Sequence, residues 1–295
     1  MEYPLINKCL FPAAGYGSRF LPATKAVPKE MLPILTKPLL QYGVEEALSA
    51  GMTNMAIVTG RGKRAIEDHF DNAFELESQL KGTSKEHYLD EIKDVIEKAT
   101  FTYVRQEQML GLGHAILSGE PLIGNEPFAV ILADDLCDCS GDEVISQLIK
   151  AFNKYKCSVI AIEEIPLTKI EKYGVISGDL INDESEIYRV NNMLEKPNLN
   201  DLSGFNKNKT APNAESTFMG IIGRYILTPD IFKILKEIKP NKGGEIQITD
   251  ALLTQAKQGK VIACKFKGRR FDCGSVEGFL EANNHFAKKL GVNKA

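Results

Sequence analysis

The sequence lacks the features that identify several classes of protein. Its longest apolar runs, such as Phe128 to Ala133, are far too short to cross a bilayer. Its net charge is only −3, both signs are interspersed, and no block of like charge suggests a surface for nucleic acid. The stretch from Met1 to Lys8 has no apolar segment of the kind found in signal peptides. We therefore expect a cytoplasmic protein that binds neither a membrane nor nucleic acid.

The sequence also has few cysteines and histidines, and their spacing does not indicate a metal site, a disulfide framework or a nucleophile. The six cysteines are scattered, no pair of CxxC units suggests zinc, and their density is low for a disulfide scaffold. We interpret them as small buried hydrophobic residues in a reducing compartment. Cys273 is not expected to be a nucleophile, because nothing around it in the sequence supplies a base. The four histidines, including His114 in a glycine-rich turn, are not expected to be metal ligands or bases.

The sequence does contain a regular alternation of strand-like and helix-like segments. Short apolar runs indicate strands over 8–12, 54–59, 101–105, 128–133 and 158–163. Amphipathic periodicity indicates helices over 38–50 and 62–70, and Gly51 is placed to end the first of them. Such alternation is typical of an α/β fold with a mostly parallel central sheet and helices on both faces. Ligands of such sheets bind outside the carboxyl ends of the strands.

Four local signals complete this outline. The segment 140–143, Ser-Gly-Asp-Glu, is a capping box and predicts that a helix begins there. Thr228 and Pro229 predict the N-cap and first residue of another helix. The polar segment 78–98 is expected to be a helical insertion over the edge of the sheet. The segment 198–216 is rich in Asn, Lys and Ser, and we expect a surface loop in position to act as a lid.

The most informative stretch runs from Phe11 to Pro33, directly after the first predicted strand. Ala14, Gly15 and Gly17 are expected to turn several backbone N–H groups toward one point, which makes an anion-binding nest. Three cations lie in the same stretch: Arg19, Lys25 and Lys29. A triphosphate is the natural ligand of such a loop.

Three kinds of phosphate-binding loop begin with closely spaced glycines. A P-loop ends in Gly-Lys-Ser/Thr, which is absent here. A dinucleotide-binding fingerprint needs a third glycine where Phe20 stands, followed by an uninterrupted helix. Pro22, Pro28 and Pro33 exclude that helix, because proline removes a donor and clashes with the preceding turn. An extended, proline-stiffened loop around a nucleoside triphosphate fits all of these residues, so a nicotinamide oxidoreductase is not expected.

The stretch resembles the signature of the sugar-1-phosphate nucleotidyltransferases, which runs roughly G-x-G-S/T-R-…-P-x-T-K-…-P-K-x-x-x-P. The sequence from Phe20 to Pro33 is most similar to that of the family members that use UTP and glucose 1-phosphate. The resemblance continues through Arg105-Gln106, Gly111-Leu-Gly-His-Ala115, Leu132-Ala-Asp-Asp135, Tyr173-Gly-Val175, Glu195-Lys-Pro197, Gly223-Arg-Tyr225, Gly244-Glu-Ile-Gln-Ile-Thr-Asp250 and Phe271-Asp-Cys-Gly-Ser275. Nine motifs in family order over nearly the whole chain argue strongly against chance.

The resemblance implies a Rossmann-like, three-layer nucleotidyltransferase fold with a small sugar-binding and C-terminal appendage. Residues 1–295 then form a single domain. We expect a nucleotide-binding half over about 1–140, a sugar-binding half over about 141–275 and a C-terminal helix over about 276–295. Because the family resembled is oligomeric, a homodimer or homotetramer is also expected.

Carboxylates at strand ends suggest a metal site. Asp134 and Asp135 end the buried run that begins at Phe128, and Asp272 follows a later strand region. Mg²⁺ takes hard oxygen ligands, usually one or two carboxylates together with phosphate oxygens and water. The resemblance assigns Mg²⁺ to Asp134 and Asp272, and we expect Asp135 to contact substrate.

The remaining predicted contacts concern the base and the sugar phosphate. Gln106 offers one acceptor and two donors, which match the edge of a uracil, and the resemblance assigns the base to Gln106 and Gly111. Glu195 is expected to accept hydrogen bonds from sugar hydroxyls, and Lys196 to meet the phosphate of glucose 1-phosphate. Gly174 would allow the backbone to approach the sugar closely.

These assignments predict an enzyme that forms UDP-glucose and pyrophosphate from UTP and glucose 1-phosphate. An oxygen of the sugar phosphate attacks the α-phosphorus of UTP in line, so the protein must align and neutralise two anions. The predicted catalytic residues are Arg19, Lys29, Asp134, Lys196 and Asp272. Two alternatives stay open at this point: a transferase of the same fold that uses dTTP, CTP, ATP or GTP, and a non-catalytic nucleotide-sugar sensor.

Overall fold

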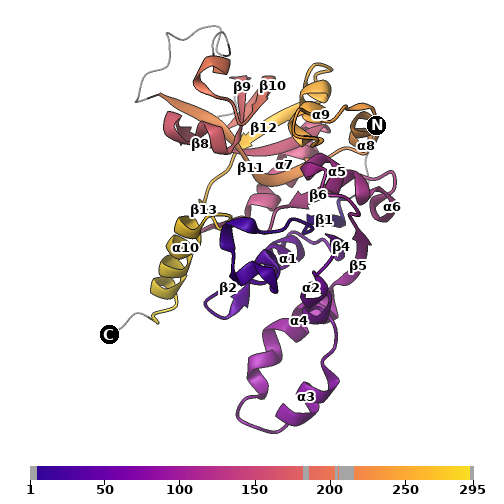
Figure 1. The fold of residues 1–295 in the computed structure, drawn as a ribbon, viewed down its shortest axis with the longest axis vertical. Coiled ribbons are helices and arrows are strands. Elements are labelled where there is room, and N and C mark those ends of the chain that lie inside the picture. Colours follow the sequence, from indigo (N-terminus) through magenta and orange to yellow (C-terminus); the bar gives the residue numbers. More distant parts are fainter. Residues whose placement is uncertain (1–4, 182–185, 203–204, 206–215, 293–295) are drawn as a thin grey trace.

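A nine-stranded sheet runs through the centre of the computed structural model, which describes residues 5–181, 186–202, 205 and 216–292 (Figure 1). The strands lie in the order β5 (Thr100–Arg105), β4 (Asn54–Thr59), β1 (Lys8–Pro12), β6 (Phe128–Ile131), β11 (Thr217–Leu227), β8 (Ser158–Pro166), β12 (Val261–Lys265), β10 (Ile187–Glu195) and β9 (Gly174–Leu180). The five strand regions predicted from apolar runs all belong to this sheet, and β1 and β4 have the predicted bounds.

The sheet changes character along its width. Strands β5, β4, β1 and β6 pair in parallel, as the alternation of strands and helices predicted. Beyond them β11 is antiparallel to β6 and β8, and β10 is antiparallel to β12 and β9, while β8 and β12 are parallel. The sheet is therefore mixed. Its α/β class is confirmed, and the expected parallel pairing is concentrated in the first half.

Helices cover both faces of the sheet and make three layers, as expected (Figure 1). One face packs against α1 (Leu39–Ser49), α2 (Arg64–His69), α4 (Asp90–Lys98) and α7 (Val144–Tyr155). The other packs against α5 (Gly111–Ser118), α6 (Glu120–Ile123), α8 (Asp230–Glu237) and α9 (Ile248–Ala256). Strand β1 shows why two cores form: Cys9 and Phe11 point into the first, and Leu10 points into the second.

A buried ion pair ties the first layer together. In α1, Glu46 accepts from the guanidinium of Arg224 in β11, with Nη2 2.8 Å from Oε2. Glu46 Oε1 also accepts from the backbone N–H of Ile145 at 3.0 Å, at the start of α7. Because this carboxylate caps α7, the predicted capping box at 140–143 is wrong: the helix begins at Val144, and its N-cap, Glu143, makes no side-chain cap.

The helix start predicted at Thr228 was also misplaced. The N-cap of α8 is Pro229, and the first helical residue is Asp230. The Thr228 hydroxyl does not cap the helix, because it bonds instead to the buried side chains of Ser158 and Gln255, each at 3.1 Å. Hydrogen bonds to buried side chains in the core thus replace the helix-capping hydrogen bond that was predicted for Thr228.

The two polar segments have different outcomes. The segment 78–98 is helical as expected: α3 (Phe74–Leu80), a 3₁₀ turn over Glu86–Leu89 and α4 project from one end of the molecule (Figure 1). The predicted surface loop 198–216 includes a 3₁₀ turn over Leu199–Leu202, and residues 203–204 and 206–215 lie outside the described residues. Along the described ranges, none of the helices has the length and apolar character that crossing a bilayer requires.

A small appendage beside the main sheet carries residues of the predicted site from two distant parts of the chain. Strands β7 (Asp135–Asp138) and β13 (Arg269–Asp272) form an antiparallel pair, and α10 (Val276–Lys289) packs on them. The helix agrees with the one expected over about 276–295, and Ser275 caps it by accepting from the Gly278 N–H at 3.2 Å. A short hairpin of β2 (Pro33–Ile34) and β3 (Lys37–Pro38) joins the same core.

Candidate active site

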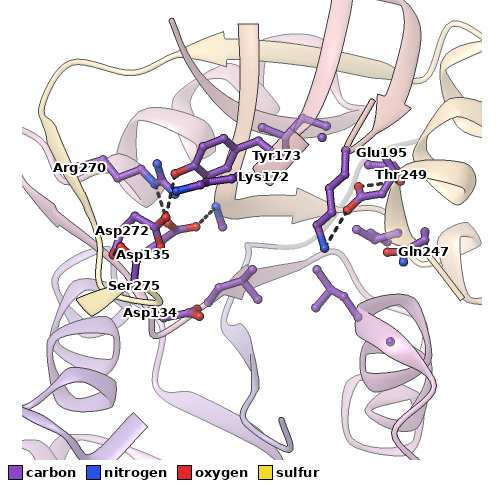
Figure 2. Close-up of a pocket in the computed structure, with 18 of the residues that line it drawn as sticks. Asp134, Asp135, Lys172, Tyr173, Glu195, Gln247, Thr249, Arg270, Asp272 and Ser275 are labelled. Carbon is purple, nitrogen blue, oxygen red and sulfur yellow. Dashed lines mark hydrogen bonds and ion pairs between the residues drawn. The ribbon is translucent and has the colours of Figure 1, made fainter. Parts of the chain in front are cut away.

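A cavity of about 740 Å³ opens beside the segments that follow β1 and β6. Eight sequence-predicted residues line it: Arg19, Gly111, Asp134, Asp135, Gly174, Glu195, Lys196 and Asp272. Figure 2 shows Asp134, Asp135 and Asp272 gathered at one end and Glu195 at the other. We call these the carboxylate end and, after the sugar contact predicted for Glu195, the sugar end. The structure thus brings residues from near both ends of the chain, Arg19 and Asp272 among them, into one cleft.

The other predicted residues are not part of the cavity lining. Lys29 does not line the cavity, but its Nζ lies 2.5 Å from Oδ2 of Asp134. Gly17, with a φ of 66°, packs so tightly on Lys29 that an added Cβ would come within 2.9 Å of the Lys29 Cβ. Ala14 is buried, whereas a Cβ on Gly15 would meet no atom within 4 Å. This backbone therefore leaves open space at Gly15, as a phosphate nest requires.

The segment after β1 is an irregular loop, as the prolines predicted. Three 3₁₀ turns over Ser18–Phe20, Ala23–Lys25 and Lys29–Met31 replace the continuous helix of a dinucleotide fold. Its far end is anchored by Glu30, which is 1% exposed and accepts from Lys63 Nζ at 2.7 Å. The other oxygen of Glu30, Oε1, is buried and has no partner among the described residues. This buried ion pair holds Lys29 in place next to Asp134.

Gln106 occupies a buried position at the end of β5. Its Nε2 donates to the Gly111 carbonyl oxygen at 3.2 Å and lies 2.9 Å from His114 Nδ1. Gly111 has a φ of 89°, and an added Cβ there would come within 2.9 Å of Glu245 Cβ. Because only glycine adopts this backbone easily, Gly111 can bring Gln106 and the start of α5 together.

Two predicted metal ligands converge on Gly274. A Cβ built on Gly274 would lie 2.9 Å from Asp134 Oδ2 and 3.1 Å from Asp272 Oδ1. Arg19 Nη1 would lie 3.2 Å from the same point, and it donates to the Gly274 carbonyl oxygen at 3.1 Å. Two carboxylates and one guanidinium from distant segments therefore share one small volume. Within the described ranges, no group of three or more His, Cys, Asp or Glu side chains could hold a metal ion.

Opposite charges set the ionisation of this end. Burial would raise the pKa of Asp134, but the Lys29 ammonium, backbone hydrogen bonding and Arg19 hold it below its usual range. Burial would lower the pKa of Lys29, but Asp134 and Glu30 raise it above its usual value. Both groups are therefore charged at neutral pH.

Asp135 is held by the protein itself. Its Oδ1 accepts from Arg270 Nε at 2.5 Å, and its Oδ2 accepts from the Gly223 N–H at 2.7 Å. Burial raises the pKa of Asp135, although Arg270 opposes this. Arg270 also donates to Glu163 Oε1 at 2.6 Å. The structure therefore gives Asp135 internal partners in addition to its place in the lining.

Tyr173 and Arg270 are the main residues that the sequence reasoning did not assign. The Tyr173 hydroxyl donates to Asp272 Oδ2 at 2.8 Å, and its backbone oxygen accepts from the Lys196 N–H at 3.1 Å. The Arg270 guanidinium lies 4.7 Å from the centre of the Tyr173 ring. Burial raises the pKa of Tyr173 to about 12, so its hydroxyl keeps its proton. Tyr173 belongs to a motif noted in the sequence, whereas no pattern there pointed to Arg270.

The sugar end is built from β9, β10 and α9. Glu195 Oε2 accepts from the Thr249 hydroxyl at 3.1 Å, and burial raises the pKa of Glu195. A Cβ on Gly174 would come within 3.0 Å of Thr249 Cγ2 and 3.2 Å of Glu195 Oε2, so only glycine fits there without displacement. Lys196 has a φ of 43°, an uncommon backbone for a side chain of this type and one often found at functional sites. Thr249 was missed although it lies in a noted motif.

Known proteins resemble this chain along nearly its whole length. A family model described as nucleotidyl transferase matches residues 10–289. A UTP–glucose-1-phosphate uridylyltransferase of Pseudomonas aeruginosa is 59% identical over 287 residues, which cover 97% of this chain and 98% of that protein.

Solved structures agree with this likeness. An apo-UDP-glucose pyrophosphorylase has a TM-score of 0.88 and 58% identity, with 97% of this chain and 99% of that chain covered. A UDP-glucose pyrophosphorylase complexed with UDP-glucose has a TM-score of 0.84 and 56% identity, with 97% and 100% covered. Sequence, fold and cavity lead to one conclusion: the chain belongs to the nucleotidyl transferase family.

Proposed function

We propose that the chain is an enzyme that forms UDP-glucose and pyrophosphate from UTP and glucose 1-phosphate. The observation that carries the proposal is end-to-end identity of 59% to a UTP–glucose-1-phosphate uridylyltransferase, in a chain whose cavity keeps charged groups at both ends. Intact cationic and carboxylate side chains at both ends favour catalysis over a non-catalytic sensor.

The chain's own residues would bind and align two anions. Arg19 and Lys29 would hold the triphosphate and the leaving pyrophosphate, next to the open backbone at Gly15. Lys196 would hold the phosphate of glucose 1-phosphate, while Glu195 accepts from sugar hydroxyls. With the two anions held in this way, the attacking oxygen would lie in line with the α-phosphorus, and most of the rate enhancement would come from alignment and charge neutralisation.

A divalent metal, Mg²⁺, fits the carboxylate end. Asp134 Oδ2 and Asp272 Oδ1 lie 2.9 Å and 3.1 Å from the point that a Cβ on Gly274 would occupy. These are hard oxygen donors, and two protein carboxylates with phosphate oxygens and water suit Mg²⁺. Asp134 and Asp272 would hold the ion, which when bound neutralises phosphate oxygens as a Lewis acid.

Gln106 and Gly111 would recognise the base. The Nε2 group of Gln106 is engaged with Gly111 and His114, which leaves its Oε1 to accept from the N3–H of uracil. This assignment makes UTP the nucleotide, although dTTP shares the same N3–H. The sequence-predicted halves would follow the ligands: the phosphate loop and Gln106 come from residues 1–140, and Lys196 and Asp272 from 141–275. A homodimer or homotetramer and a cytoplasmic location stay predictions.

The test is pyrophosphate release by purified protein with Mg²⁺, five nucleoside triphosphates and several sugar 1-phosphates. We expect UTP with glucose 1-phosphate to be the fastest pair and UDP-glucose to be the product. Faster turnover with dTTP would contradict the uracil assignment. Binding of UTP without pyrophosphate release, in protein whose thermal unfolding shows that it is folded, would favour the sensor.

A further inference from the structure

The two ends of the cavity meet at a single residue. The Tyr173 hydroxyl donates to Asp272 Oδ2 at 2.8 Å, at the carboxylate end. The Tyr173 backbone oxygen accepts from the Lys196 N–H at 3.1 Å, at the sugar end. Figure 2 shows the ring reaching from the upper wall of the cavity toward Asp272. Among the described contacts, these two bonds make a direct connection between the predicted metal ligand and the predicted sugar-phosphate lysine.

The Tyr173 ring is held firmly enough to position its hydroxyl. The Arg270 guanidinium lies 4.7 Å from the ring centre and is itself fixed by Asp135 at 2.5 Å and Glu163 at 2.6 Å. A guanidinium stacked on an aromatic face and anchored by two carboxylates has little freedom. The hydroxyl therefore reaches Asp272 from a rigid support.

Asp272 needs such a partner. In the β7–β13 pair, Asp272 lies directly opposite Asp135, and two like charges in that arrangement repel. Arg270 neutralises Asp135, and the Tyr173 hydroxyl occupies Asp272 Oδ2. The remaining oxygen, Oδ1, accepts from the Gly274 N–H at 3.2 Å and lies at the point shared with Asp134. The hydroxyl thus selects which oxygen of Asp272 faces the metal position.

The backbone contact has a matching role at the other end. Lys196 adopts a φ of 43°, a conformation that persists only when its surroundings hold it. The N–H of Lys196 donates to the backbone oxygen of Tyr173. Gly174, which follows Tyr173 in the chain, packs so closely that an added Cβ would crowd Glu195. Ordering of Lys196 by a bound phosphate would therefore also order residue 173.

We propose that Tyr173 is a positioning residue that orients Asp272 for the metal and couples metal binding to sugar-phosphate binding. The inference rests on the proposed function for the identity of the two ligands. It assigns no chemistry to the hydroxyl, which keeps its proton. It does assign a measurable consequence: removal of one oxygen atom weakens metal binding, although that atom need not touch the metal.

Tyr173→Phe tests the first part, with Mn²⁺ as a spectroscopic probe for the metal. Free Mn²⁺ is measured by electron paramagnetic resonance during titration of each protein without nucleotide. We expect the variant to bind Mn²⁺ roughly 10-fold to 100-fold more weakly, the range typical for loss of a ligand's hydrogen-bond partner. Affinity within twofold of the parent protein would overturn the inference.

Tyr42→Phe is the matched control. Its hydroxyl donates to the Ile34 carbonyl oxygen at 3.4 Å, away from the lining of the cavity. This variant should bind Mn²⁺ as the parent does, and both variants should bind UTP normally in EDTA. Equal loss of Mn²⁺ affinity in both would mean that the effect is not specific to Asp272, and would overturn the inference.

The coupling has its own measurement. Glucose 1-phosphate should tighten Mn²⁺ binding in the parent protein, and Mn²⁺ should tighten glucose 1-phosphate by the same factor. In Tyr173→Phe that factor should fall toward one, whereas retention of the full factor would overturn the coupling. These measurements need no turnover. A parent protein that releases no pyrophosphate would therefore defeat the proposed function, while the effect on Mn²⁺ would still decide the inference.

Discussion

The two ends of the cavity hold their charged groups in different ways. At the carboxylate end each acid has a close partner within the protein: Lys29 at 2.5 Å for Asp134, Arg270 at 2.5 Å for Asp135, and Tyr173 at 2.8 Å for Asp272. At the sugar end the Lys196 side chain is 51% exposed, and its ammonium lies 3.6 Å from Glu195. One end is internally paired, and the other leaves its cation open to solvent.

This difference indicates how each end meets its ligand. At the carboxylate end a metal–nucleotide bound as proposed would have to replace a contact, because Lys29 already occupies Asp134 Oδ2. At the sugar end a phosphate can reach Lys196 without breaking a short ion pair. Substitutions at the first end should therefore change catalysis itself, whereas those at the second should mainly change the affinity for the sugar phosphate.

Asp134→Asn should give the largest effect. The amide keeps the shape of the side chain but removes the charge that would hold Mg²⁺ and pair with Lys29. We expect kcat to fall on the order of 10²–10³, as when one electrostatic group is removed from an active site. Asp138→Asn, four residues along in β7 and paired with His285 and Lys289, is the control. Near-normal turnover of Asp134→Asn at saturating Mg²⁺ would show that Asp134 is not a principal ligand.

Gly274→Ala should come next. The new methyl group would lie 2.9 Å from Asp134 Oδ2 and 3.1 Å from Asp272 Oδ1, so the two carboxylates must move apart. We expect kcat to fall on the order of 10², the loss typical of a small displacement of catalytic groups. Gly141→Ala places its methyl group in open space and should be neutral. If both variants turn over equally, the convergence on Gly274 has no role in catalysis.

Lys196→Ala should act on one substrate only. A charge-assisted contact to phosphate contributes about 1.5–3 kcal/mol, so its loss should raise KM for glucose 1-phosphate roughly tenfold or more. UTP binding, measured by calorimetry, should change little, because the predicted nucleotide contacts lie elsewhere. Lys236→Ala, an exposed lysine on α8, serves as the control. Collapse of UTP affinity with an unchanged KM for glucose 1-phosphate would place Lys196 in the nucleotide site.

Thr249→Val should give the smallest effect and a pH signature. Burial raises the pKa of Glu195, and the Thr249 hydroxyl opposes this by stabilising the charged form. As pH falls through that raised pKa, Glu195 gains a proton and accepts sugar hydroxyls less well. The variant should raise KM for glucose 1-phosphate about threefold to tenfold, and the acid loss should begin at higher pH.

Thr254→Val on the same helix is the control for that profile. Its hydroxyl donates to the Asp250 carbonyl oxygen at 3.0 Å and has no contact with Glu195 among the described interactions. The Thr254→Val profile should match that of the parent. If Thr249→Val gives the same profile as well, Glu195 does not bind the sugar in its charged form.

Continuous apolar runs made part of the fold predictable. Strands β1 and β4 are short and largely buried, and both of their ends were predicted correctly. Strand β11 was missed because its glycines read as breaks. Gly220 packs against Ile165, and Gly223 against Leu132, so both allow close packing within the strand. Strand β10 was missed because its buried residues Ile187, Val190 and Met193 recur every third position, and a register shift between Val190 and Asn192 interrupts the two-residue period of a strand.

Local sequence patterns also revealed only part of the site. Motifs that resemble those of the family predicted Asp134, Asp272 and Lys196 as site residues, and the structure places all three in one cavity. They could not show that Tyr173 reaches Asp272, because that contact joins residues 99 positions apart and depends on how two sheets meet. Arg270 was not predicted because it belongs to none of the motifs, and a single arginine outside a motif does not indicate a site.

The buried carboxylate of Glu46 has a consequence for the chain as a whole. It joins α1 to Arg224 in β11 and to the first turn of α7, so its partners lie outside residues 1–140. A fragment that ends at residue 140 would keep the carboxylate and lose both the guanidinium and the Ile145 N–H. An unpaired charge in that position is strongly destabilising. Residues 1–140 and the remainder of the chain are therefore not separable modules, and a gene split at that point should give products that are stable only after they reassociate.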